Sequence, residues 1–187
     1  MNLLDSVRRR FARPPEQVRA AVDSAGDGDE RILAWGKLDG NEGWLVATSR
    51  GLRTLDAVGA PVDLLRWHEV ALARWTARPP GGSFQVTPLA EVEPGVQTRQ
   101  PARWFVLTDA GDLPATVRRR VDETVVASQR APLPNGGGAL LVARRIPGQP
   151  GREWTVVFDD DTDRADPEAR EVARQKLAEL VAAEQPD

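Results

Sequence analysis

The sequence predicts an α+β protein built around an antiparallel sheet, and three observations carry this prediction. Between about Arg31 and Leu107, apolar residues recur with a period of two and turn residues separate them, as in short strands. Before and after this stretch, the apolar residues follow the period of a helix. The length of 187 residues and the hydrophobic content of 41% suit one domain, or one domain with an appended half.

The composition argues against several classes of protein. The chain has no cysteine, so it can form neither a disulfide nor a thiolate zinc site, and a cytoplasmic location is expected. No apolar run approaches the roughly 18 residues of a membrane span, and the first residues do not resemble a signal peptide. The net charge of -3 argues against nucleic-acid binding, because domains that bind nucleic acid are basic.

An N-terminal helical segment is expected over residues 1–28. Residues 1–13 are amphipathic, with an apolar face opposite a run of arginines, and a second short helix is expected over Pro15–Asp23 because proline suits a first helical turn. The first helix can dock on its own domain, which is the preferred interpretation. It can also rest on an anionic membrane surface.

A β-rich domain is expected over residues 29–131. Its first two strands are Ile32–Gly36 and Trp44–Thr48, joined by the turn Asp39–Gly43. Further strands are expected at Leu52–Leu55, Val62–Trp67, Ser83–Thr87 and Arg103–Leu107. The segment His68–Trp75 follows a junction at His68 that leads from a strand into either a second strand or a helix. Strands at this spacing, with turn residues between them, indicate a meander that closes into a barrel or a sandwich.

Helical periodicity returns after these strands. Asp112 is suited to cap a helix that runs through Val117, Val121 and Val125 and ends near Arg130. Residues 132–187 are then expected to form a ββα extension packed on the same core. Its parts are a hairpin of Ala139–Ile146 with Glu153–Phe158, and a last helix capped by Asp166 with Pro167 at its first position.

No catalytic or metal-binding motif is complete in this sequence. The single histidine, His68, precedes Glu69, but Leu72 stands where an HExxH zinc motif needs its second histidine. The acidic run 159–163 begins like a calcium-binding EF-hand loop, but arginines replace the required glycine and the last glutamate. Phosphate-binding, dinucleotide-binding and G-x-S-x-G motifs are also missing. We therefore expect no catalytic, cofactor-binding or metal-binding residues and no enzyme activity.

The candidate residues for contact with a ligand or partner are Trp67, His68, Glu69 and Trp75, which lie close together in the sequence. A lone histidine beside a carboxylate is more often structural than functional. The tryptophans all fall on expected strands or their ends, where large aromatic side chains fill a sheet core. An aromatic ligand pocket is the alternative.

The segment Arg31–Leu89 resembles the bacterial pleckstrin-homology-like (PH-like) and GRAM-like modules. The resemblance rests on the hairpin into Trp44–Leu52, the segment Leu64–Val70 and the following Trp75. It implies a partly open seven-stranded barrel closed by the helix at 112–130 and used for binding rather than catalysis. The acidic turn at 39–42 lacks the basic cluster of the phosphoinositide-binding members. As a whole, the chain also looks like small proteins that are common in actinobacteria.

These features together predict a non-enzymatic binding or scaffold module that acts through protein–protein contacts, with another protein or with a second copy of itself. No small molecule and no cofactor is indicated. One alternative is a peripheral membrane protein that uses the helix at 1–13. An enzyme of unrecognised type is another.

Overall fold

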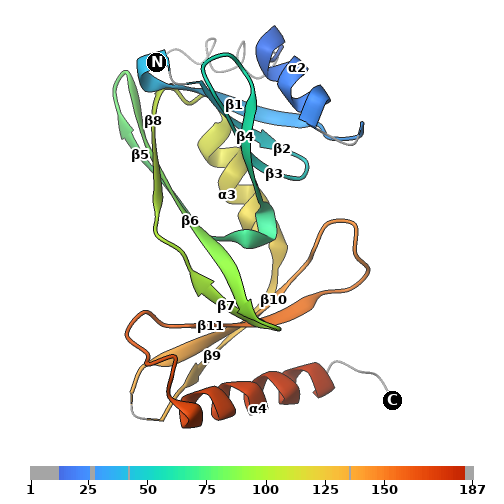
Figure 1. Ribbon diagram of the computed structural model, residues 1–187, viewed down its shortest axis with the longest axis vertical. Coiled ribbons are helices and arrows are strands. Elements are labelled where there is room, and N and C mark those ends of the chain that lie inside the picture. The colour runs from blue at the N-terminus through green and yellow to red at the C-terminus, as the bar shows by residue number, and fades with distance from the viewer. Residues whose placement is uncertain (1–12, 26–27, 42, 135, 184–187) are drawn as a thin grey trace. The chain divides into compact units, whose positions relative to one another are not determined.

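The computed structural model describes residues 13–25, 28–41, 43–134 and 136–183 (Figure 1). The described residues form three α-helices and eleven strands, so the fold is of the mixed α+β type that the sequence predicts. The eleven strands belong to one hydrogen-bonded sheet that is not closed, whereas the strand spacing led us to expect closure. Residues 1–12, which make up nearly all of the first expected helix, lie outside the described residues.

The chain divides into two compact units with separate cores. Unit 1 holds the described residues up to Pro88 together with Ala102–Asp122, and unit 2 holds Leu89–Pro101 and the described residues from Glu123 onward. The borders between the units therefore fall at other places than the expected domain borders at 28/29 and 131/132. The chain passes from one unit to the other three times.

Unit 1 contains an antiparallel sheet of seven strands in the order β4-β3-β2-β1-β8-β6-β5. Its strands are β1 (Ile32–Leu38), β2 (Trp44–Thr48), β3 (Gly51–Leu55), β4 (Pro61–Arg66), β5 (Val70–Arg78), β6 (Gly81–Glu93) and β8 (Arg103–Asp109). All the strands expected between Arg31 and Leu107 are present, because each alternating run has a neighbour with which its backbone can pair.

The turn between β1 and β2 also forms where it was expected. The 3-10 helix η1 (Asp39–Asn41) reverses the chain, and the Leu38 N–H donates a hydrogen bond of 3.0 Å to the Gly43 carbonyl. Gly43 has a φ of 124°, and a Cβ added there would lie 2.0 Å from the Leu55 carbonyl oxygen. A residue with a side chain would therefore separate β2 from the end of β3.

Helices cover both faces of the first strands of unit 1. Helix α2 (Glu16–Ala25) buries Val18, Ala21 and Val22 against Val46 and Leu55. Helix α3 (Leu113–Thr124) buries three residues of its apolar face in the main core of the unit. This core contains Leu45, Leu52, Trp67, Phe84, Leu107, Leu113, Val117 and Val121 among others. The alternation of side chains along the strands supplies one apolar set to each helix.

The prediction of a helix over 112–130 is wrong in its second half. Helix α3 ends at Thr124, and Val125–Pro132 forms strand β9, which pairs antiparallel with β10 (Gly138–Arg144). The valines that continue the helical period are β-branched and suit a strand equally well. Pairing with β10 satisfies the backbone of this segment and decides between the two structures.

Unit 2 is a small sheet with a helix on one face. Its strands follow the order β7-β11-β10-β9, with β7 (Val96–Arg99) parallel to β11 (Glu153–Phe158). Helix α4 (Pro167–Ala183) buries Ala169 and Ala173 against Leu141, Val156 and Phe158. The predicted hairpin and last helix are confirmed, and the Asp166 carboxylate caps the helix by accepting from the Glu168 N–H at 3.0 Å.

Candidate functional site

Both tryptophans among the four candidate residues belong to the core of unit 1. Trp67 is 2% exposed, and its indole Nε1–H donates a hydrogen bond of 3.0 Å to the Thr48 carbonyl. Trp75 is half-buried, and its ring lies 6.2 Å from that of Phe84 between centroids. A Cβ added to Gly82 would lie 2.4 Å from the Trp75 ring, so the glycine provides the space for the indole. Both side chains therefore pack the protein's own interior.

His68 and Glu69 lie in the short 3-10 helix η2 (Trp67–Glu69), between β4 and β5. The His68 Nε2 is 4.0 Å from the Glu69 carboxylate, which is too long for a hydrogen bond. The other oxygen of Glu69 accepts a hydrogen bond of 3.0 Å from the Arg66 N–H and closes the turn. The structure thus gives Glu69 a role in shaping the chain at the start of β5.

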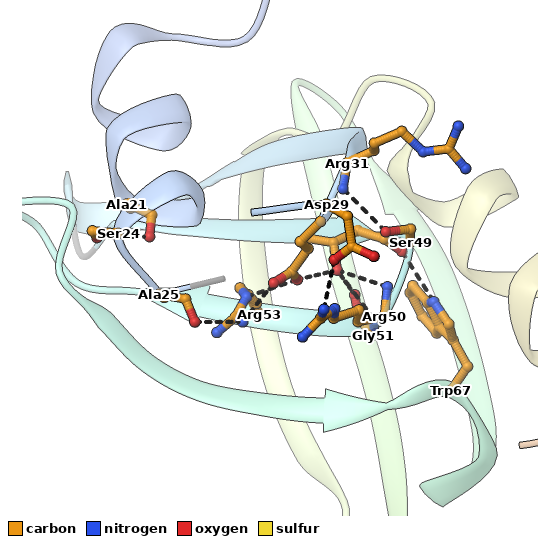
Figure 2. A network of polar contacts seen from close by, with 12 residues as sticks. Ala21, Ser24, Ala25, Asp29, Arg31, Ser49, Arg50, Gly51, Arg53 and Trp67 are labelled. Carbon is orange, nitrogen blue, oxygen red and sulfur yellow. Dashed lines mark hydrogen bonds and ion pairs between the residues drawn. The ribbon is translucent and has the colours of Figure 1, made fainter. Parts of the chain in front are cut away.

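A buried ion pair, which the sequence did not reveal, joins Glu30 to Arg53 on β3. The Arg53 guanidinium donates hydrogen bonds of 2.9 Å and 2.6 Å to the two Glu30 oxygens, and the Thr48 hydroxyl donates a third of 2.5 Å. The side chains of Glu30 and Arg53 are only 1% and 8% exposed. Figure 2 shows Arg53 also reaching the Ala25 carbonyl, at 3.4 Å. The pair therefore fastens the segment between α2 and β1 to strand β3, which lies next to the edge strand β4.

An exposed ion pair lies beside the buried one and offers a comparison. Arg50 reaches the Asp29 carboxylate at 2.6 Å, as Figure 2 shows, but the Asp29 side chain is 83% exposed. The Thr48 hydroxyl oxygen accepts from the backbone N–H of Arg50 and of Gly51, both at 3.2 Å, and shapes the turn from β2 to β3. Every charged group here has a partner within the fold, so the network has a structural role.

The network lowers the pKa of Glu30. Burial by itself raises this pKa, but the hydrogen bonds from Arg53 and Thr48 and the charges of Arg53 and Arg50 outweigh burial. A carboxylate whose pKa is lower in the folded protein than in the unfolded chain stabilises the fold above its unfolded pKa. That stabilisation is lost as the pH falls through the folded pKa.

We therefore expect the free energy of unfolding to fall on acidification below about pH 4.3, the ordinary pKa of glutamate. Part of this fall comes from Glu30, and that part is absent in Glu30→Gln. Urea unfolding of the natural chain and of Glu30→Gln across the acid range measures this contribution of Glu30. The difference in stability between them should narrow as the pH falls, and a constant difference would contradict the assignment.

An exposed apolar surface lies on the outer face of β5, β6 and β8, and we call it the Trp104 face. Paired residues of neighbouring strands share a face. Two rows of three paired residues therefore cross the Trp104 face, Arg74–Gln85–Trp104 and Thr76–Ser83–Val106. The face consists of Leu72, Arg74, Thr76, Arg78, Ser83, Gln85, Thr87, Trp104 and Val106. It is formed entirely by unit 1.

Trp104 corrects the expectation that every tryptophan packs in a sheet core. Trp104 is 63% exposed, Val106 is 55% exposed and Leu72 is 42% exposed. The alternate residues of β8 and β6, among them Leu107 and Phe84, point to the opposite side and are buried in the core. The apolar surface of the Trp104 face therefore contributes little to the fold.

The charges on the Trp104 face are all positive. Arg74 and Arg78 are exposed, and among the described residues neither takes part in an ion pair. The face has no aspartate or glutamate, although the chain as a whole carries a net charge of -3. This surface is thus apolar at Trp104 and basic along β5.

Unit 2 holds a small cavity between α4 and the strands. It measures about 150 Å³, and apolar side chains line most of it, including Val96, Val156 and Leu177. An ion pair between Glu93 and Arg170 also borders it. Pockets for small molecules usually measure about 300–1,000 Å³, so this cavity is smaller than a usual substrate site.

The described part of the chain contains no group of three or more His, Cys, Asp or Glu side chains that could hold a metal ion. In the acidic run 159–163, Asp159 pairs with Arg130 and Asp160 with Arg99. None of the described helices combines the length and the apolar character needed to cross a membrane.

Comparison of the chain with protein-family models, with curated proteins and with solved structures finds no match.

Proposed function

We propose that this chain is a non-enzymatic binding or scaffold module of the cytoplasm that acts through protein–protein contacts. The Trp104 face carries the proposal. A tryptophan, a valine and a leucine exposed on one sheet face form an apolar surface that water solvates poorly, and a partner that covers it gains free energy. Tryptophan and arginine are the residues most enriched at the centres of protein interfaces.

We also propose that unit 1 is a PH-like module. Two features support this proposal: seven antiparallel strands in the order β4-β3-β2-β1-β8-β6-β5, and a helix, α3, directly after the last of them. A likeness of fold does not name a ligand. The ligand has therefore to be argued from the exposed residues and not from the fold.

The residues most suited to chemistry support a binding role over catalysis. The single histidine lies in a turn whose glutamate bonds to the backbone, and the best-enclosed acidic group, Glu30, is neutralised by Arg53. The cavity in unit 2 is small and mostly apolar. A general acid or base needs access to a substrate, and the geometry of Glu30 gives it none.

A photo-reactive amino acid placed at position 104 tests the proposed function. In cells of the native host, we expect it to cross-link to a protein partner or to a second copy of this chain. The matched control is the same group at position 62, since Val62 is 66% exposed on strand β4 and lies off the Trp104 face. Absence of a product at position 104, or identical products at both positions, would refute the proposal.

A further inference from the structure

We infer that the Trp104 face binds an acidic protein segment, whose carboxylates pair with Arg74 and Arg78 while an apolar side chain covers Trp104. This inference rests on the proposed function and names the chemistry of the partner. Its first support is the row Arg74–Gln85–Trp104, which places a cation and an aromatic ring on the same face with one strand between them. A single short segment can contact both.

The charges select the partner. Arg74 and Arg78 lie on the same face of β5, four pairs apart in its register with β6. Neither has an ion-pair partner among the described residues, in contrast to Arg50, Arg53 and Arg103 of the same unit. Arginine binds carboxylates in a bidentate manner, and such contacts give an interface its direction and specificity. An extended segment with carboxylates four residues apart matches this spacing, because each strand residue rises about 3.3 Å.

A second copy of this chain is a poorer occupant of the face. Two Trp104 faces brought together would enclose Arg74 and Arg78 of both copies in one interface, and the face has no carboxylate to pair with them. Like charges in an interface oppose association. An acidic segment of another protein is therefore the better occupant of the face.

Nucleic acid shares part of the required chemistry, because bases stack on exposed tryptophan and phosphates pair with arginine. The observations favour protein nonetheless. The face offers two arginines among hydroxyl and amide side chains, and the whole chain is negative, so a long phosphate backbone would be repelled beyond the face.

Fluorescence anisotropy with defined probes tests the inference. The first probe is a labelled peptide with alternating glutamate and serine around a central phenylalanine. The second carries lysine in place of each glutamate, and the third is a labelled single-stranded DNA of mixed sequence. We expect the full chain to bind the glutamate peptide at low salt at least about tenfold more tightly than either other probe.

Variants assign this binding to the Trp104 face. Arg74→Gln with Arg78→Gln should weaken binding of the glutamate peptide about fivefold to tenfold, and Trp104→Ser about tenfold or more. The matched control is Arg31→Gln with Arg145→Gln, which removes the same charge from exposed positions off the face and should leave affinity within about twofold.

Three results would overturn the inference: equal binding of the glutamate and lysine peptides, equal loss in the two double variants, or tighter binding of the DNA. These results are distinct from failure of the proposed function. A cross-link from position 104 to a protein, combined with no preference for the glutamate peptide, would refute the acidic partner and leave the binding module in place.

Discussion

Replacing Glu30 by glutamine is expected to lower the free energy of unfolding by about 3–5 kcal/mol. The substitution keeps the shape of the side chain but leaves the Arg53 charge without a counter-charge in a place where Arg53 is 8% exposed. The lost attraction is only part of this loss. Most of it is the cost of holding an uncompensated guanidinium away from water. Urea unfolding at neutral pH measures the change.

A double variant separates the two contributions. Glu30→Leu with Arg53→Met removes both charges together, and we expect it to recover most of the stability that Glu30→Gln loses. Asp29→Asn is the matched control, because it removes the carboxylate of the neighbouring exposed pair and should cost less than about 1 kcal/mol. If the double variant were as unstable as Glu30→Gln, the leftover charge on Arg53 would not be the cause.

A substitution at Arg144 on β10 is expected to have the second large effect, and here the free energy of unfolding should rise. This side chain is 7% exposed, its only partner among the described residues is the Thr124 hydroxyl at 3.0 Å, and its Nε has none. Burial lowers the pKa of the guanidinium, because the charged form is held away from water. Arg144 is thus a buried cation without a counter-charge.

Arg144→Met is therefore expected to raise the free energy of unfolding by about 1–3 kcal/mol. Removing the unpaired charge stabilises the folded protein by several kcal/mol. Loss of the hydrogen bond to Thr124 offsets about 1 kcal/mol of this gain. Methionine has a similar length and adapts to the space left behind. Chemical unfolding of the variant and of Arg145→Met, a control at the next, exposed position, measures the difference. A variant less stable than the natural chain would contradict this account.

Much of the fold could be predicted from the sequence because the signals are local. Alternating residues and turn glycines place β1 to β4, and proline after a capping aspartate places the start of α4. Strand β7 (Val96–Arg99) was missed because four residues carry too little pattern. Its pairing with β6 and β11 holds it in place, and β11 lies far from it in the sequence.

The candidate site was harder to predict. Strand β8 contains the run Trp104–Leu107, in which both faces are apolar, so alternation cannot tell which face is buried. The structure resolves this by placing Phe105 and Leu107 toward the core, which leaves Trp104 outside. The Glu30–Arg53 pair was missed for another reason. The two residues are 23 positions apart, and only the pairing of β1, β2 and β3 brings them together.

Strand β6 gives its first part, as far as Pro88, to unit 1 and the rest to unit 2. As a consequence, no single cut in the gene yields the two units as separate, whole products. A fragment that stops at Pro88 lacks β8 and α3, and with them Leu107, Leu113 and Val117 of the first core. A fragment that starts at Glu123 lacks β7, whose Val96 packs on the core of unit 2. The protein is therefore best dissected by point substitutions in the full chain.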